Sequence, residues 1–182
     1  MIVLFEGVDG GGKTTLIKRL LKTFPDAEEI EWPGRRDDPN EFVKSCKDFL
    51  ESIKDKENDG KLYFLDRCGI GEFLYGPITP GRKMAKTSEY AEVFKKWLKG
   101  KLLIICINQD AHKLAIERGE DGPAKDKTFH NYVSAGYRAL ANGSGLHIIG
   151  YNFKNDPQAY DNIVGTILAH RVIEVLQYDN SK

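Results

Sequence analysis

Eight residues near the start of the chain combine the side chains and backbone needed to hold a triphosphate. Residues 7–14 read Gly-Val-Asp-Gly-Gly-Gly-Lys-Thr, which matches the phosphate-binding pattern G-x-x-x-x-G-K-[ST] at every defined position. Glycines let backbone N–H groups approach phosphate oxygens closely. We expect Lys13 to reach the β- and γ-phosphates and the Thr14 hydroxyl to take a position on Mg²⁺. The predicted site for ATP and Mg²⁺ comprises Gly7, Asp9, Gly10, Gly11, Gly12, Lys13, Thr14 and Thr15.

A second pair of candidate residues, Asp66 and Arg67, follows the apolar run at residues 62–65. Ligands of open α/β sheets collect at the carboxyl ends of the strands. There Asp66 can order Mg²⁺, directly or through water, and Arg67 can form a bidentate contact with phosphate oxygens. Alone, an acid and a base after a strand are equally consistent with a surface ion pair. Beside a complete phosphate-binding loop they indicate phosphoryl transfer.

The elements that must position these residues alternate along the chain. Short runs typical of strands recur at 2–5, 29–32, 62–65, 102–107 and 146–149. The runs that are continuously apolar, such as 102–107, favour strands covered on both faces, as in a parallel sheet. Apolar residues at helical spacing predict helices near 15–24, 42–53, 90–98 and from Pro157 towards the C-terminus. This alternation predicts one doubly wound α/β domain over residues 1–182.

Composition argues against several other classes of protein. The chain has 182 residues, of which 41% are hydrophobic and 30% charged, which is typical of a globular domain. No apolar run approaches the roughly 20 residues of a membrane helix, and no basic leader precedes the first strand, so we expect a cytoplasmic protein without membrane contacts. Lys and Arg total 27, as do Asp and Glu, and proteins that grip long nucleic acids usually carry a basic excess. Cys46, Cys68 and Cys106 match no zinc spacing and are expected to be buried thiols.

Three segments resemble a known family of kinases. Residues 5–15, Phe-Glu-Gly-Val-Asp-Gly-Gly-Gly-Lys-Thr-Thr, resemble the start of thymidylate kinases, and Asp66-Arg67 resembles their Asp-Arg motif. Residues 32–35, Trp-Pro-Gly-Arg, are similar to their Phe-Pro-x-Arg segment, and residues 73–78 resemble thymidylate-kinase-like proteins of phages. The resemblance runs from residue 1 to about 140. It implies a P-loop kinase domain with a five-stranded parallel sheet in the order 2-3-1-4-5, helices on both faces and a short lid at about residues 109–127.

The same resemblance implies roles for further residues. Arg35 would hold the phosphate of the acceptor, with Arg36 as the alternative because the sequence does not say which of the two points inward. Asp9 would contact the acceptor sugar, and Arg118 would bind ATP from the lid. Trp32, and either Phe42 or Phe49, are candidates for contacting the acceptor base, although core packing is the simpler interpretation of Trp32. Thymidylate kinases also carry a base-contacting arginine in this region, whereas this sequence has no arginine between Arg36 and Asp66.

Because the base-contacting arginine of thymidylate kinases is missing, the acceptor-binding part of the predicted site differs from theirs, and three functions remain open. The first is ATP- and Mg²⁺-dependent transfer to a deoxynucleoside monophosphate, with dTMP as the leading guess, catalysed by Lys13, Asp66, Arg67 and Arg35. The second is transfer to a hydroxyl of a deoxynucleoside, or of a modified base or end in DNA. A hydroxyl needs a general base, and Glu31 occupies a place where the related deoxynucleoside kinases keep a catalytic Glu; an exposed strand-end acid is the simpler interpretation. The third is a nucleotide-binding switch with little turnover. A small nucleotide is the expected partner, and a homodimer is compatible with all three functions.

Overall fold

The computed structural model describes residues 1–34, 38–79, 81–83, 87–98, 101–108, 110–119, 125–143, 148–151 and 157–179, and all structural statements concern these residues. Its strands are β1 (Ile2–Gly7), β2 (Glu28–Glu31), β3 (Tyr63–Asp66), β4 (Leu102–Cys106) and β5 (Ile148–Tyr151). All pair in parallel, in the order β2-β3-β1-β4-β5. The predicted α/β class and parallel sheet are therefore confirmed. The strands β2, β3, β1 and β4 carry the site described below, and β5 pairs with the outer side of β4.

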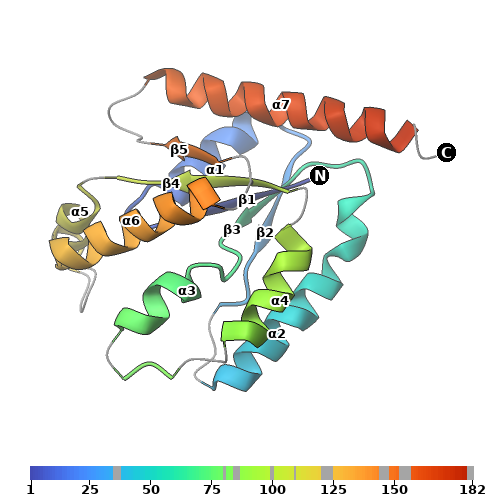
Figure 1. Cartoon of the computed structure of the whole chain (residues 1–182). Helices are drawn as coiled ribbons and strands as arrows, with labels where there is room; N and C mark the ends of the chain where they lie inside the picture. The colour runs from blue at the N-terminus through green and yellow to red at the C-terminus, as the bar shows by residue number, and fades with distance from the viewer. Residues whose placement is uncertain are drawn as a thin grey trace.

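Helices cover both faces of this sheet (Figure 1). They are α1 (Lys13–Thr23), α2 (Pro39–Ser52), α3 (Glu72–Tyr75), α4 (Thr87–Leu98), α5 (Ala111–Glu117), α6 (Lys127–Gly143) and α7 (Pro157–Asp179), with short 3-10 turns at Lys54–Glu57 and Gly76–Ile78. Alternate strand residues point to opposite faces. Leu4 and Leu65 pack with α2, α4 and α6 on one face. Phe5 and Phe64 pack with α1 and α7 on the other.

Local signals fix where the helices begin. Asp38 caps α2 by accepting hydrogen bonds from the N–H groups of Asn40 and Glu41, and Pro39 suits the first helical position because its fixed φ is already helical. The first helix begins at Lys13, the last-but-one residue of the phosphate-binding pattern. Part of the predicted lid at 109–127 is the helix α5, whereas residues 109 and 120–124 lie outside the described part of the chain.

The last helix, α7, is only partly packed. Ala159, Tyr160, Ile163 and Ile167 are buried against the sheet and α1, while Leu168, Val172 and Ile173 are exposed. Even so, none of the described helices combines the length and apolar character that crossing a membrane requires.

Candidate active site

The loop between β1 and α1 lies against β4, and this contact explains two of its glycines. A Cβ on Gly7 would lie 2.0 Å from the carbonyl oxygen of Cys106. A Cβ on Gly11 would lie 2.7 Å from the same oxygen and 2.7 Å from that of Val8. Only glycine fits at either position. The loop then leads directly into α1, whose first N–H groups have no partner within the helix and favour an anion.

Lys13 is a buried cation inside this loop. Its side chain is 6% exposed, and its Nζ donates to the carbonyl oxygens of Gly7 and Val8 at 3.0 Å each. Burial, and then the positive charge of Arg67, lower the pKa of Lys13. Two cations held this close favour an anion between them, as expected of a phosphate site.

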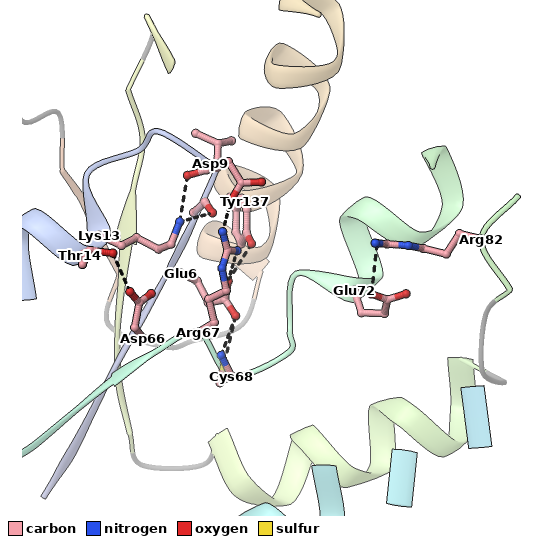
Figure 2. A network of polar contacts seen from close by, with 12 residues as sticks. Glu6, Asp9, Lys13, Thr14, Asp66, Arg67, Cys68, Glu72, Arg82 and Tyr137 are labelled. Atoms are coloured by element: carbon pink, nitrogen blue, oxygen red, sulfur yellow. Dashed lines mark hydrogen bonds and ion pairs between the residues drawn. The ribbon is translucent and has the colours of Figure 1, made fainter. Parts of the chain in front are cut away.

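Thr14 and Asp66 meet across the start of α1 and the end of β3 (Figure 2). The Thr14 hydroxyl donates to Oδ2 of Asp66 at 2.9 Å. The other carboxylate oxygen, Oδ1, is buried and has no hydrogen-bond partner in the described part of the chain. A hydroxyl and a carboxylate are the hard oxygen ligands that Mg²⁺ prefers, and this ion takes few protein ligands beside substrate phosphates. These residues therefore fit Mg²⁺.

Arg67 has an unusual backbone. Its φ is 70°, and it is the only non-glycine residue with positive φ among those described. Such conformations cost about 1–3 kcal/mol and tend to occur at functional sites. One end of its guanidinium group donates to Oδ1 of Asp9, and its Nη1 lies 4.0 Å from Oε2 of Glu6. The guanidinium group of this strained residue is thus directed towards Glu6 and Asp9, at the end of β1 and in the loop after it.

Sequence reasoning assigned no role to Glu6, which is the most buried acid of this region. Its side chain is 1% exposed. One carboxylate oxygen accepts the Cys68 N–H at 2.9 Å, and the other accepts the Tyr137 hydroxyl at 2.8 Å. The available signal was a charged residue inside the apolar strand at residues 2–7. Cys68 is buried, and burial, and then the charge of Glu6, raise the pKa of its thiol, which favours the neutral thiol and agrees with the predicted role of a small filler. Cys46 and Cys106 are also buried free thiols.

Two cavities open on either side of Arg67. The first has a volume of about 570 Å³ and is lined by Asp9, Gly10, Gly12, Lys13, Thr14, Thr15, Glu29, Glu31, Trp32, Asp66, Arg67 and Arg118. The second has a volume of about 320 Å³ and is lined by Glu6, Asp9, Trp32, Gly34, Phe42, Arg67, Gly69, Gly71, Glu72, Tyr75 and Arg82. Among the described residues, three line both cavities: Asp9, Trp32 and Arg67.

Comparison with known proteins identifies this architecture. The family model for the viral superfamily 1 RNA helicase core domain matches residues 3–75, which is less than half of the chain. No curated protein sequence matches. Among solved structures, the YorR protein from Bacillus subtilis, in complex with phosphorylated GDP, superposes with a TM-score of 0.67 at 13% identity over 98% of both chains. Thymidylate kinase from Candida albicans gives 0.63 at 17% identity over 93% of this chain and 92% of the other. Deoxyadenosine kinase from M. mycoides gives 0.55 at 12% identity over 93% and 99%.

The chain has the fold of a P-loop kinase. At these identities the similarity shows the fold alone. The helicase match spans β1 to α3, which contains the phosphate-binding loop and Asp66. The phage-type resemblance of residues 73–78 stays a prediction.

Most residues predicted from the sequence gather around the two cavities. Every predicted ATP-binding residue except Gly7 and Gly11 lines the first cavity, and those two glycines hold its loop against β4. Phe42 and Gly34 line the second cavity. Arg35 and Arg36 lie outside the described residues. The charged residues Glu72 and Arg82 of the second cavity were missed.

Trp32 and Glu31 sit side by side in the sequence but differ in their surroundings. Trp32 packs edge-on against Phe49 with ring centroids 4.8 Å apart, and it also lines both cavities, so it has the packing role favoured from the sequence and a place in the site. Glu31 is exposed at the end of β2, in register with Asp66 of β3. It lines the first cavity and is absent from the lining of the second.

Proposed function

We propose that the protein is a kinase that transfers the terminal phosphoryl group of ATP to a deoxynucleoside monophosphate, with dTMP as the first candidate. The observation that carries the proposal is the position of Arg67, which lines both cavities and lies beside Lys13. In this assignment the first cavity binds ATP and the second binds the acceptor. Arg67 then stands where the charge of the transferred group develops.

The chain's own residues orient and neutralise the phosphates. Backbone N–H groups of the loop and of the first turn of α1 cradle the β-phosphate. Lys13 exchanges its carbonyl partners for β- and γ-phosphate oxygens, and Arg67 leaves the half-exposed Asp9 to bind the transferred group. Thr14 and Asp66 would hold Mg²⁺, which when bound would neutralise charge on the phosphates. The bond from the γ-phosphorus to its bridging oxygen breaks, and a bond to an acceptor oxygen forms.

The second cavity supports a nucleotide as the acceptor. Glu72 and Arg82 form an ion pair at 3.3 Å, with only 11% and 19% of the side chains exposed. A carboxylate accepts the N–H of a base and a guanidinium group donates to its carbonyl, so the pair matches the adjacent N–H and C=O groups of thymine. Phe42 and Trp32 supply the apolar surface for the ring. Arg82 thereby offers the arginine that the sequence lacks between Arg36 and Asp66.

The acceptor phosphate is assigned to Arg35, or to its neighbour Arg36, because Gly34 lines the second cavity immediately before them. A phosphate oxygen is already anionic, so transfer to it requires no general base and proceeds by positioning and charge neutralisation. The position of Glu31 supports this choice of acceptor. A general base must reach the acceptor hydroxyl, but Glu31 lines only the cavity assigned to ATP.

The test is to incubate the protein with γ-labelled ATP, Mg²⁺ and a panel of nucleosides, monophosphates and DNAs. We expect label on a deoxynucleoside monophosphate, and loss of label with the Arg67→Ala variant but not with Arg19→Ala on the exposed side of α1. Label on a nucleoside or on DNA would instead indicate a kinase that phosphorylates a hydroxyl group. A DNA substrate would also bind with an affinity that falls steeply as the salt concentration rises. Nucleotide binding without any labelled product would favour the switch.

A further inference from the structure

The carboxylate of Glu6 ties together three parts of the chain (Figure 2). Oε1 accepts the backbone N–H of Cys68 at 2.9 Å and contacts its thiol at 3.5 Å. Oε2 accepts the hydroxyl of Tyr137 at 2.8 Å, from a helix 131 positions further along the chain. A buried carboxylate is tolerated only when donors satisfy it. Glu6 therefore links β1, the segment after β3 and α6 at one point.

The carboxylate of Glu6 contacts the chain immediately after Arg67, whose backbone is strained. The N–H of Arg67 donates to the carbonyl of Phe5 at 2.9 Å, and the next N–H, of Cys68, donates to Glu6. The two N–H groups on either side of the Arg67 Cα, its own and that of Cys68, are thus bonded to β1. A positive φ at a residue with a Cβ persists only where the surroundings over-determine it, and these two hydrogen bonds are such surroundings.

Glu6 and Arg67 nevertheless do not form a close ion pair. Arg67 Nη1 lies 4.0 Å from Oε2 of Glu6, whereas a charge-assisted hydrogen bond is about 2.7–2.9 Å long. The Tyr137 hydroxyl occupies that oxygen instead. Burial, and then the charge of Glu6, raise the pKa of Tyr137. The hydroxyl therefore stays protonated and donates a hydrogen bond to Glu6. The guanidinium group pairs with the half-exposed Asp9, from which phosphate can displace it.

The Tyr137 hydroxyl fits beside Gly71 because glycine has no side chain there. A Cβ at Gly71 would lie 2.7 Å from the hydroxyl oxygen and 3.6 Å from Oε2 of Glu6. Its φ is −56°, which alanine adopts without strain, so a Gly71→Ala change would disturb Tyr137 through contact alone. The chain therefore offers two independent ways to disturb this hydroxyl without altering Arg67 or Glu6.

We propose that Glu6 and Tyr137 are positioning residues for Arg67: Glu6 holds its backbone, and the Tyr137 hydroxyl keeps the Glu6 carboxylate from capturing its guanidinium group. The part of this inference that concerns catalysis rests on the proposed function. Without the hydroxyl, Oε2 loses its donor, and the nearest cationic donor among the described residues is Arg67. The guanidinium group would then move from Asp9 towards Glu6 and away from the first cavity, which Glu6 does not line.

The kinetic test is a double-mutant cycle between Tyr137→Phe and Arg67→Ala, with Tyr132→Phe as the control because Tyr132 is 54% exposed on the same helix. A displacement of about 1 Å at a positioned group can cost on the order of 10²-fold in rate. We expect Tyr137→Phe to lower kcat by about 10- to 100-fold with the KM for ATP within about twofold. In the Arg67→Ala background the same change should have no further effect on kcat. A general loss of structure would instead lower both backgrounds equally.

A crystal structure of the Tyr137→Phe protein tests the inference without relying on catalysis. We expect the distance from Arg67 Nη1 to Glu6 Oε2 to fall from 4.0 Å to about 3 Å, and Gly71→Ala to move Arg67 in the same direction. If the wild type transfers no phosphate but Arg67 moves in this way, the proposed function fails and the positioning role stands. A guanidinium group that stays in place in both variants, or an equal kcat loss with and without Arg67, overturns the positioning role.

Discussion

Replacing Lys13 by methionine should separate nucleotide turnover from stability. The change removes two charge-assisted hydrogen bonds of 3.0 Å to the carbonyls of Gly7 and Val8, each worth about 1.5–3 kcal/mol. It also removes the desolvation penalty of a buried cation, which is several kcal/mol, and methionine fills a similar volume. The two effects oppose each other. We expect the free energy of unfolding to change by no more than about 2 kcal/mol, measured by urea denaturation with Lys18→Met on the exposed side of α1 as the control.

The pH dependence of the same experiment has a defined sign. The pKa of Lys13 in the folded protein lies below its ordinary value of 10.5, so in alkaline solution the unfolded chain binds more protons. The contribution of Lys13 to the free energy of unfolding therefore rises as the pH increases from the pKa of Lys13 in the folded protein to 10.5. The Lys13→Met variant should lack this rise, and Lys18→Met should keep it.

Turnover should respond in a different way. Losing one preorganised charge at a phosphoryl group lowers kcat by about 10²–10³-fold, roughly 3–4 kcal/mol. The assay is the initial rate of label transfer at saturating ATP, corrected for the folded fraction. A Lys13→Met protein that keeps more than about a tenth of wild-type kcat, or loses activity only in proportion to its unfolded fraction, would refute the role of Lys13 in the site.

Four further substitutions test the remaining parts of the site. Asp66→Asn keeps an acceptor for Thr14 but loses the charge, so the initial rate should fall about 10²-fold and recover in part as Mg²⁺ is raised; a rate independent of Mg²⁺ would contradict the assignment. Glu72→Gln should change the ratio of kcat/KM between acceptor bases by about 10-fold or more, because a buried group is left unsatisfied, whereas an equal loss for every base would indicate a structural role only. Glu31→Gln should alter kcat less than about threefold, and a loss of 10²–10⁴-fold would indicate a hydroxyl acceptor. Arg35→Ala, or failing that Arg36→Ala, should weaken acceptor binding by about 2–3 kcal/mol in calorimetry; an equal loss of ATP affinity would argue against a phosphate clamp.

The sequence predicted those parts of the molecule that are local in the chain. The phosphate-binding loop is a continuous strand-loop-helix segment, so its glycines and Lys13 could be placed before any tertiary contact was known. Asp66 could be placed as well, because a residue at the carboxyl end of a buried parallel strand must lie at the same edge of the sheet as the loop. The α/β class followed from the same alternation. The boundaries of elements were less accurate, as with the second helix, which starts at Pro39 and not near residue 42.

Contacts between distant segments could not be predicted in this way. The hydrogen bond from Tyr137 to Glu6 spans 131 positions, and nothing in the local pattern of either residue indicates a partner. Tyr137 has helical spacing and fits core packing equally well. Arg82 follows α3 and the turn after it, where no strong periodicity exists, so its approach to Glu72 depends on how that segment folds back over the second cavity.

The charges that line the two cavities give a final reason to expect Mg²⁺ and one further cation. Among the described residues that line them, carboxylates outnumber cations in both cavities, so the summed side-chain charge of these residues does not favour a polyanion in either. In the first cavity, Mg²⁺ beside Thr14 and Asp66 would reverse that balance. In the second, Arg82 is already paired with Glu72, which leaves Arg67 to serve both ligands. An acceptor phosphate therefore needs another guanidinium group, and the chain supplies two directly after Gly34.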